Sequence, residues 1–505
     1  MEAVFMKKSV MLKQFISLAA VSVLLVLCLL PAAVLAEEDQ AEPDEREIPF
    51  RRGGFGYALL EDNTVEILDY TGKDTRLNIP KSIGGYPVSS IGEDAFFGNE
   101  TLRAVRVPEG VKTLGKNAFG SCIYLEKVTL PQGLTSVGAW AFHQCEALAS
   151  LSLPDTVTEI GDMAFGSCYT LQSFTFPESV TSIGSRLFDG CWDLTEITIP
   201  DTLTAVGANP FSDCRCLEKI TLSPDHPTLE LVDGVLFSRP DHRLVYYPVT
   251  READHYTIPQ GTEIIGAFAF HHAAALTGID LPSSVREIQQ EAFAWCSALA
   301  SLSLPEGVTS LPRGVFSYCK ALSEFTLPSS VTEIDAYAFN QSGITRLEIP
   351  AGIPEIREGT FTGCSKLQEI FIPETVTTVG RLAFDGCSAL SEITLPAACT
   401  QLPDFTFRDC RSLKRIVIPE GVTEIGESAF SGCKSLEEAV LPSTLRKIGF
   451  RAFCECQSLA SIALPEGLGE IGDEAFYLCK SLTQADIPSS VTKIGEDVFA
   501  FSGVR

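Results

Sequence analysis

The sequence is poor in basic residues: 38 Lys and Arg stand against 65 Asp and Glu in 505 residues, which gives a formal net charge of −27. Proteins that bind nucleic acid or anionic membrane surfaces select basic patches, so this balance argues against both kinds of partner. The chain also has no second long apolar run after its first 36 residues. We therefore expect no nucleic-acid partner, and contact with a membrane only through the N-terminal segment.

Motifs that mark catalytic and cofactor sites are lacking too. The sequence has no HExxH, no GxSxG, no phosphate-binding loop and no GxGxxG after a strand. Three of its six His, namely His226, His242 and His255, share one segment and could meet, although His in loops is usually only solvated. The other three, at 143, 271 and 272, have no metal-ligand spacing either. We expect no enzyme, no metal and no cofactor.

The N-terminus has the pattern of a secretory signal peptide. Three Lys precede an apolar run from Phe15 to Leu30, and Val34 and Ala36 stand at the −3 and −1 positions of a cleavage site. The alternative is an uncleaved anchor, because the run approaches the length of a short membrane span. Residues 1–36 are thus predicted as signal peptide or anchor. The acidic residues 37–54, which contain Pro43, are predicted to form a flexible tether.

What the chain has in abundance is a repeat with a consensus close to LxxIxLPxxVTxIGxxAFxxC. Its period of about 23 residues lies within the range of roughly 20 to 29 residues that is typical of leucine-rich repeats. One gap of 59 residues and one step of 22 residues interrupt the series, which still predicts 17 coils. The Phe residues that mark it are Phe96, Phe119, Phe142, Phe165, Phe188, Phe211, Phe270, Phe293, Phe316, Phe339, Phe361, Phe384, Phe407, Phe430, Phe453, Phe476 and Phe499.

Each part of the repeat has a physical role. Leu151 and Leu153 alternate with polar residues as one face of a short strand requires, and Pro154 ends that strand. Val157 to Ile160 alternate again, Gly161 turns the chain, and the Ala-Phe pair is expected in a brief helical or 3₁₀ turn. Pro replaces the Gly in two repeats, so that position does not strictly need a positive φ. Because stacked coils share one core, the sequence predicts a mainly β leucine-rich-repeat solenoid of short parallel strands.

Thirteen of the 17 Cys recur three positions after a Phe of the series. Equivalent residues on adjacent coils lie about 4.8 Å apart with parallel Cβ vectors, which suits neither disulfides nor a zinc ion. Asn99, Ala273, Ser342 and Ser502 fill the same position in other repeats. The prediction is a buried ladder of free thiols, with Cys214/Cys216 and Cys454/Cys456 left as possible disulfides. The ladder is Cys122, Cys145, Cys168, Cys191, Cys214, Cys296, Cys319, Cys364, Cys387, Cys410, Cys433, Cys456 and Cys479.

The repeat resembles that of the BspA-type leucine-rich-repeat proteins of bacterial surfaces, LxxIxIPxxVTxIGxxAFxxC, over residues 55–505. The opening segment YALLEDNTVEILDYTGKDTRLNIPKSIGGYPVSSIGEDAF is similar to the family's N-terminal cap, here residues 55–93. Repeats are expected over 94–222 and 259–505, the latter without a C-terminal cap. Between them, residues 223–258 resemble an excursion common in the family and are predicted as a β-hairpin, with a turn at Pro240-Asp241.

Two surface features are candidate ligand-binding sites. The outward strand position two places before each Pro is Ser or Thr in the first half of the chain, but later becomes more apolar. We name these later residues the C-terminal strip; Glu369 and Arg415 border it. Tyr169 and Trp192 follow successive ladder Cys and should lie one above the other, although packing of a loop would also explain them. The strip consists of Phe371, Thr394, Val417, Val440 and Ala463.

The resemblance implies a secreted or cell-surface protein that presents an extended repeat surface to an extracellular protein or glycan, with no shared catalytic site. A structural spacer or matrix component, held in the cell envelope by the N-terminal segment, is the alternative.

Overall fold

The structure, a computed structural model, describes residues 48–504. The chain divides into Met1–Glu47 and Ile48–Arg505, and only the second unit is described here. The predicted signal peptide and most of the predicted tether lie outside the described residues. Within 48–504 no helix is long and apolar enough to cross a membrane.

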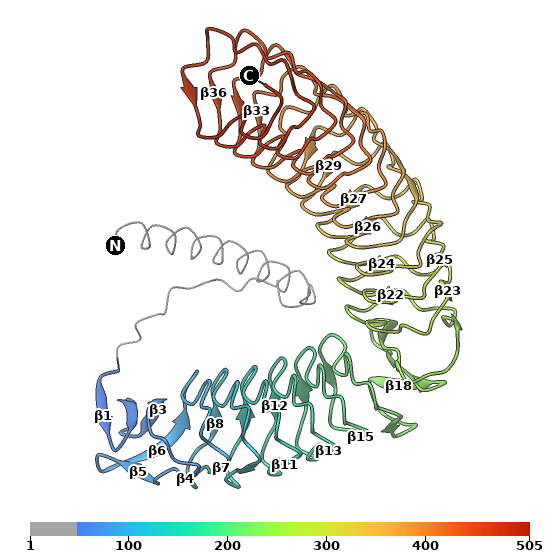
Figure 1. Ribbon diagram of the computed structural model, residues 1–505. Coiled ribbons are helices and arrows are strands. Elements are labelled where there is room, and N and C mark those ends of the chain that lie inside the picture. Colours follow the sequence, from blue (N-terminus) through green and yellow to red (C-terminus); the bar gives the residue numbers. More distant parts are fainter. Residues whose placement is uncertain (1–47, 505) are drawn as a thin grey trace, which may run out of the picture. The chain divides into compact units, whose positions relative to one another are not determined.

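The described unit is a leucine-rich-repeat β-solenoid in which most coils contribute two short strands (Figure 1). The first strand of each coil lies before the Pro of the repeat, and these strands form the first strand row. Its members are β4 (Arg76–Asn78), β7 (Ala104–Arg106), β9 (Lys127–Thr129), β11 (Ser150–Ser152), β13 (Ser173–Thr175), β15 (Glu196–Ile199), β17 (Lys219–Leu222), β21 (His255–Thr257), β23 (Gly278–Asp280), β25 (Ser301–Leu302), β28 (Arg346–Glu348), β30 (Glu369–Phe371), β32 (Arg415–Val417) and β34 (Glu438–Val440).

The second strand of each coil lies just before the Gly of the repeat, and these strands form the second strand row. Its members are β6 (Tyr86–Ile91), β8 (Thr113–Leu114), β10 (Ser136–Val137), β12 (Glu159–Ile160), β14 (Ser182–Ile183), β16 (Ala205–Val206), β22 (Ile264–Ile265), β24 (Glu287–Ile288), β26 (Ser310–Leu311), β27 (Glu333–Ile334), β29 (Glu355–Ile356), β31 (Thr378–Val379), β33 (Glu424–Ile425), β35 (Lys447–Ile448), β36 (Glu470–Ile471) and β37 (Lys493–Ile494).

Neighbouring strands within a row are parallel, and paired residues lie one repeat apart in the sequence. In β11 and β13, for example, Leu151 pairs with Phe174. Both side chains are buried while the residues on either side of them are exposed. The alternation of apolar and polar residues therefore sets which side of each strand faces the core.

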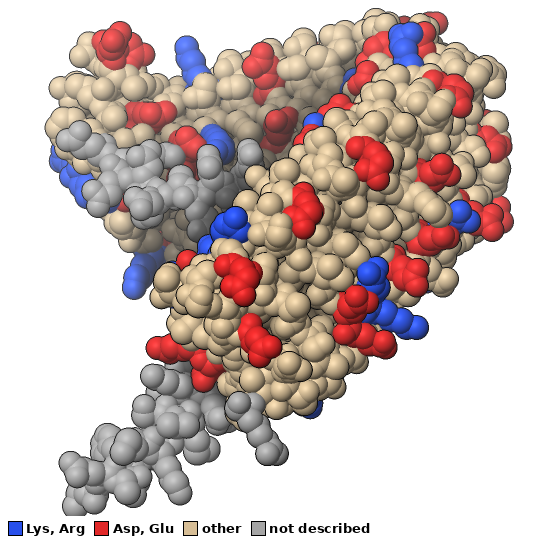
Figure 2. All heavy atoms as spheres, turned by 90° about the horizontal axis from the view of Figure 1, so that it is seen from above, with Lys and Arg blue, Asp and Glu red and all other residues tan. Residues whose placement is uncertain are grey.

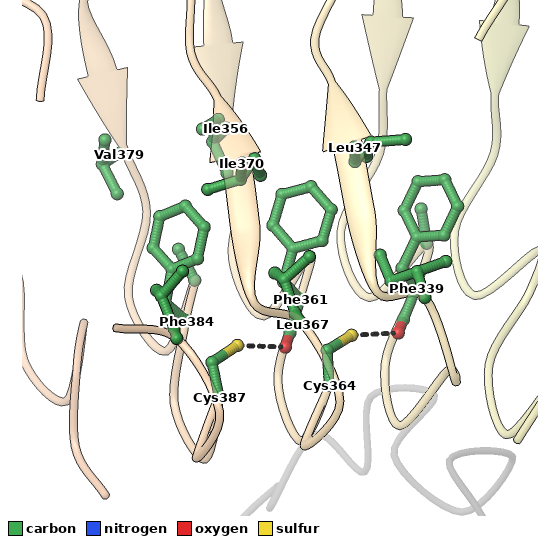
Figure 3. Packing of buried hydrophobic residues seen from close by; sticks show 14 of the residues in the cluster. Phe339, Leu347, Ile356, Phe361, Cys364, Leu367, Ile370, Val379, Phe384 and Cys387 are labelled. Carbon is green, nitrogen blue, oxygen red and sulfur yellow. Dashed lines mark hydrogen bonds between the residues drawn. The ribbon is translucent and has the colours of Figure 1, made fainter. Parts of the chain in front are cut away.

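The Phe series forms a continuous ladder of stacked rings inside the coils. Within each run of coils, successive ring centroids lie 4.8–6.1 Å apart. Figure 3 shows Phe339, Phe361 and Phe384 stacked in this way. Two Tyr extend the ladder beyond the 17 predicted coils, to about 19 turns: Tyr70 packs on Phe96 at 5.3 Å, and Tyr247 stacks on Phe270 at 5.1 Å.

The predicted helical or 3₁₀ turns are wrong: residues 48–504 contain no helix of either kind, only strands, turns, bends and irregular backbone. Around nearly every ring of the ladder the chain instead enters the left-handed region twice, two positions before and two positions after the Phe. Around Phe142 these are Trp140 at φ 60° and Gln144 at φ 57°. A left-handed residue reverses the direction of the backbone, so a helix cannot continue through it.

The Gly of the repeat is needed for close packing of adjacent coils and not for a flexible turn. Gly161 has no positive φ, as the two repeats with Pro predict. A Cβ at Gly161 would lie 2.4 Å from the backbone nitrogen of Ala139 in the preceding coil. This Gly is needed because adjacent coils approach closely at that point.

The predicted tether ends earlier than residue 54. Strand β1 (Phe50–Arg52) lies within it and pairs antiparallel with β2 (Phe55–Leu59). Phe50 stacks on Tyr57 at 5.5 Å, and Arg51 forms an ion pair with Asp69 at 2.6 Å. The strand is held by its backbone pairing with β2 and by these two side-chain contacts. With β3 (Val65–Tyr70) and β5 (Ser82–Ile83) it covers the first coil.

The segment predicted as a β-hairpin is a three-stranded antiparallel meander of β18 (Leu229–Val232), β19 (Val235–Ser238) and β20 (Arg243–Tyr246). The prediction missed β18, and β21, placed inside the insertion, belongs to the first strand row. β20 also pairs parallel with β22 and so supplies the second-row strand of an extra coil, whose ladder ring is Tyr247. The meander is visible at β18 in Figure 1.

Alternate residues of the meander pack into two different cores. Leu236 and Val245 belong to the core of the N-terminal coils, whereas Phe237 and Leu244 belong to that of the C-terminal coils. Because strand side chains alternate between faces, one sheet can close both cores. The insertion is thus a partition between two stacks of coils.

Candidate functional site

The C-terminal strip faces outward. Phe371, Val417 and Val440 are 45%, 42% and 38% exposed, and Thr394 and Ala463 are exposed as well. The residues one position earlier, Ile370, Ile416 and Ala439, are buried. The strand alternation therefore holds through this region, and the apolar side chains are surface groups.

Charged residues flank the strip, and they are paired. Arg346 lies over the ring of Phe371 at 5.1 Å and forms an ion pair with Glu369 at 3.3 Å. Arg415 forms an ion pair with Glu438 at 2.8 Å. These pairs are exposed and contribute little to stability. They leave the flanks of the strip polar but locally neutral.

The same outward position differs in the five coils from Thr129 to Thr221, where it carries only hydroxyl side chains. Water solvates such a row well, so it lacks the apolar character of the C-terminal strip. All five residues are exposed: Thr129, Ser152, Thr175, Thr198 and Thr221.

Figure 2 shows how acidic side chains are spread over one face of the molecule, often beside Lys or Arg.

Tyr169 and Trp192 stack at a centroid distance of 4.3 Å and an interplanar angle of 22°. Arg215 lies over Trp192 at 4.6 Å, and the indole Nε1 donates to Asp213 at 3.0 Å. Trp192 is thus stacked against Tyr169 and covered by the guanidinium of Arg215. This leaves little free ring surface in the cluster, which is a poor platform for a sugar.

The thirteen ladder Cys are buried, and each forms the same hydrogen bond. Sγ donates to the main-chain carbonyl oxygen of a Phe in the preceding coil at 3.0–3.3 Å, as Cys364 does to Phe339 at 3.0 Å (Figure 3). All sixteen Cys of the described part are free, including Cys214, Cys216, Cys454 and Cys456. The thiol thus links successive coils by hydrogen bonds rather than by covalent bonds.

Sequence reasoning missed one buried cluster, because its members are far apart in the chain. Ser212 Oγ lies 3.1 Å from His271 Nδ1, and His271 Nε2 lies 3.9 Å from Glu291 Oε2. Burial lowers the pKa of His271 well below its usual value and raises the pKa of Glu291. Ser212 has no exposed surface, so no substrate reaches it. The cluster packs the Phe211 coil against the Phe270 coil.

The three His of the insertion segment have separate partners. His226 is buried, with Nε2 3.2 Å from the carbonyl oxygen of Pro200, whereas His255 pairs with Asp280 at 2.8 Å. His242 is exposed. No group of three or more His, Cys, Asp or Glu that could hold a metal ion occurs in the described part of the chain.

Comparison with known proteins identifies the repeat. The family model described as "BspA type Leucine rich repeat region (6 copies)" matches residues 89–218, 247–364, 332–449 and 428–504. A leucine rich cell surface protein from Faecalibacterium prausnitzii is 32% identical, with a TM-score of 0.51, over 64% of this chain and 94% of that one. No curated protein matches significantly.

Two further solved structures are similar. A leucine-rich repeat protein from Bacteroides ovatus is 26% identical, with a TM-score of 0.29, over 90% of this chain and 92% of that one. The pneumococcal vaccine antigen PcpA is 17% identical, with a TM-score of 0.42, over 88% of this chain and 98% of that one.

Proposed function

Because the chain belongs to the BspA-type leucine-rich-repeat family, we propose that it is a secreted or cell-surface protein that binds an extracellular protein or glycan ligand through the C-terminal strip. The observation that carries this proposal is the exposure of Phe371, Val417 and Val440 on one strand face. The fold is one that typically serves binding rather than catalysis.

The size and chemistry of the strip fit a contact surface. Its five residues span about 19 Å at about 4.8 Å per coil. Apolar side chains gathered in one place on a soluble surface often mark a partner contact, and a polar rim around an apolar centre is typical of such contacts. The paired charges at Arg346–Glu369 and Arg415–Glu438 supply that rim.

Two observations support a location outside the cell membrane. The N-terminal 36 residues have the pattern of a signal peptide. The similar protein from Faecalibacterium prausnitzii is described as a cell surface protein.

The test replaces Phe371 and Val440 together by Lys. The matched control replaces Thr175 and Thr198 by Lys, since these residues occupy the same outward position in the N-terminal half. Each form is displayed on a non-adherent bacterium, and adhesion to mucin-coated wells and to epithelial monolayers is measured. We expect the Phe371→Lys/Val440→Lys form to lose adhesion and the control to keep it, with both retaining wild-type thermal unfolding.

Equal adhesion by both forms would contradict the proposal. Loss of folding in the Phe371→Lys/Val440→Lys form would show that the strip is part of the core. Absence of adhesion by the wild type, together with intact chain in the envelope fraction, would favour the structural spacer instead.

A further inference from the structure

A cavity of about 480 Å³ lies where the insertion meets the N-terminal coils. It is bounded by β17, by the turn between β18 and β19, and by the segment that follows β20. Small-molecule sites in proteins commonly have volumes of about 300–1,000 Å³, so its size suits a small ligand. The lining residues that matter here are Glu218, Lys219, Asp233, Tyr246, Arg251 and Glu252.

The cavity exists because one strand of the first row is missing. The coil whose ladder ring is Tyr247 supplies β20 to the second row, but one repeat length before β21 the chain is at the β18–β19 turn. β17 is the edge strand at the end of one sheet, and β21 is the edge strand at the start of the next. The first row is interrupted between them, and side chains of the insertion occupy only part of the space.

Some polar groups in and near this space have no hydrogen-bond partner. Nε of Arg251 and the hydroxyls of Tyr246, Tyr247 and Tyr256 are buried and form no hydrogen bond of ordinary geometry with any residue from 48 to 504. Tyr246 lines the cavity and is only 1% exposed. Of these four residues only Arg251 and Tyr246 line the cavity. Buried polar groups are nearly always satisfied, so the guanidinium Nε of Arg251 is the group that points to a bound molecule.

Arg251 also has no ion-pair partner among the described residues. Its guanidinium lies 5.6 Å from the ring centroids of both Tyr247 and Tyr256, and Nη1 donates to the carbonyl oxygen of Asp233. No carboxylate of the described residues forms an ion pair with it. A partly buried guanidinium favours a carboxylate or phosphate, which it can bind through two parallel hydrogen bonds.

The other charges of the lining restrict the choice of anion. Lys219 and Arg251 face Glu218, Asp233 and Glu252, so the lining carries a formal charge of about −1. A phosphate or a sulfated polymer, with more than one negative charge, would meet more repulsion there than a single carboxylate does. A carboxylate on a polyhydroxylated ligand also gains hydrogen bonds, because Glu and Asp side chains accept them from hydroxyl groups.

We propose that this cavity binds the carboxylate-bearing sugar of an acidic glycan. Arg251 pairs with the carboxylate, and Glu218 and Glu252 accept hydrogen bonds from the sugar hydroxyls. This site is formed by the insertion and does not depend on the C-terminal strip.

The experiment titrates the folded chain, residues 37–505, with D-glucuronate and N-acetylneuraminate by calorimetry and saturation-transfer NMR. D-glucose, acetate and a peptide with a free C-terminal carboxylate are the comparison ligands. We expect saturable binding of at least one acidic sugar, with affinity at least tenfold above that of each comparison ligand. An oligosaccharide that ends in the same sugar should bind at least as tightly as the free acid.

Two variants assign the binding to the cavity. Arg251→Gln should weaken acidic-sugar binding at least tenfold. The matched control is Arg313→Gln, since Arg313 also lies over a Tyr ring, that of Tyr337 at 4.9 Å, but outside the insertion. Glu218→Gln should reduce the ratio of the affinity for the sugar to the affinity for acetate. Because Glu218 is exposed, this variant remains informative if Arg251→Gln misfolds.

The proposal is overturned if no acidic sugar binds saturably, which would leave a cavity that holds only water. It is also overturned if acetate or the peptide binds as tightly as the sugar, or if both Arg251→Gln and Glu218→Gln bind like the wild type. If the free sugar binds but the oligosaccharide does not, the cavity is a site for a free sugar acid, and the proposal that it binds a glycan is wrong.

Discussion

The thiol of Cys387 donates a hydrogen bond to the main-chain carbonyl oxygen of Phe361 in the preceding coil, at 3.2 Å (Figure 3). A buried carbonyl that is left unsatisfied destabilises a protein by about 1–3 kcal/mol, so this bond gives the recurring Cys a physical reason. Its geometry also keeps the sulfur directed at a carbonyl rather than at the next sulfur. The ladder is therefore compatible with an oxidising environment without forming disulfides.

Thiol reactivity should separate one Cys from the rest. Cys216 is the only exposed Cys among the sixteen of the described part. Burial raises the pKa of Cys122 and of Cys168 to about 12, which removes the reactive thiolate at neutral pH. In the folded protein at pH 8, alkylation followed by mass spectrometry should modify one thiol quickly and the others slowly.

The Cys216→Ser form should lose the fast reaction. Under denaturant and without reductant, all sixteen thiols should react. A majority of sulfurs that stay blocked under those conditions would mean that they form disulfides, and the hydrogen-bonded ladder would be wrong.

The ring ladder should be a main source of stability. Phe430 is fully buried and stacks between Phe407 and Phe453 at 5.5 Å and 5.1 Å. Phe430→Ala should reduce the free energy of unfolding by roughly 3–5 kcal/mol, measured by urea denaturation. Phe97 is 53% exposed, and Phe97→Ala is the control with little expected change. Equal stability of the two variants would show that the rings do not hold the coils together.

The repeat Gly should resist even a methyl group. A Cβ at Gly449 would lie 2.8 Å from the backbone carbon of Gly426 in the preceding coil, so Gly449→Ala should destabilise the protein by roughly 1–3 kcal/mol. Gly133 has no atom within 4 Å of the same position, and Gly133→Ala should change the stability by less than about 1 kcal/mol. Chemical denaturation of both variants tests this; a tolerated Gly449→Ala would mean that adjacent coils can separate locally.

Acid should destabilise the fold through its buried His. Burial lowers the pKa of His143, His271 and His272. A His with a depressed folded-state pKa stabilises the protein above its unfolded pKa of about 6.5, and this stability is lost as the pH falls toward the folded value. Urea unfolding at pH 5.0 should therefore show lower stability than at pH 7.5, by on the order of 1 kcal/mol per unit of depression.

Glu291 should oppose this trend. Its pKa is raised by burial, so its contribution is present below its unfolded pKa and is lost as the pH rises through the folded value. The Glu291→Gln form should consequently lose more stability between pH 7.5 and pH 5.0 than the wild type does. A smaller loss would show that Glu291 is ionised in the folded protein throughout this range.

The period of the repeat was enough to predict those features of the coil that are marked by a recurring residue type. The Phe ladder and the outward direction of Phe371 follow from spacing, because side chains alternate along a strand and each coil has nearly the same length. The left-handed positions could not be predicted, since residues as different as Trp140, Arg186 and Leu382 occupy them. Their conformation is imposed by stacking on the neighbouring coils and not by a local preference for positive φ.

The insertion shows a second limit of sequence reasoning. Tyr247 takes the place of a Phe, so the extra coil did not register as a repeat. Ser212 and His271 lie on either side of the insertion, and Arg251 gains its position over Tyr247 and Tyr256 only when the meander folds. Both clusters arise from an interruption of the repeat, and a periodic pattern contains no information about what fills an interruption.

The constant offset of one repeat between strand partners has a genetic consequence. Duplication or deletion of a DNA segment that encodes one repeat adds or removes one whole coil, while every other residue keeps the same kind of neighbour above and below it. Unequal recombination between repeats can therefore change the number of coils without changing the contacts between the coils that remain. Point mutations on the outward positions can then diversify the surface, because the buried coil-to-coil contacts are made elsewhere in the repeat.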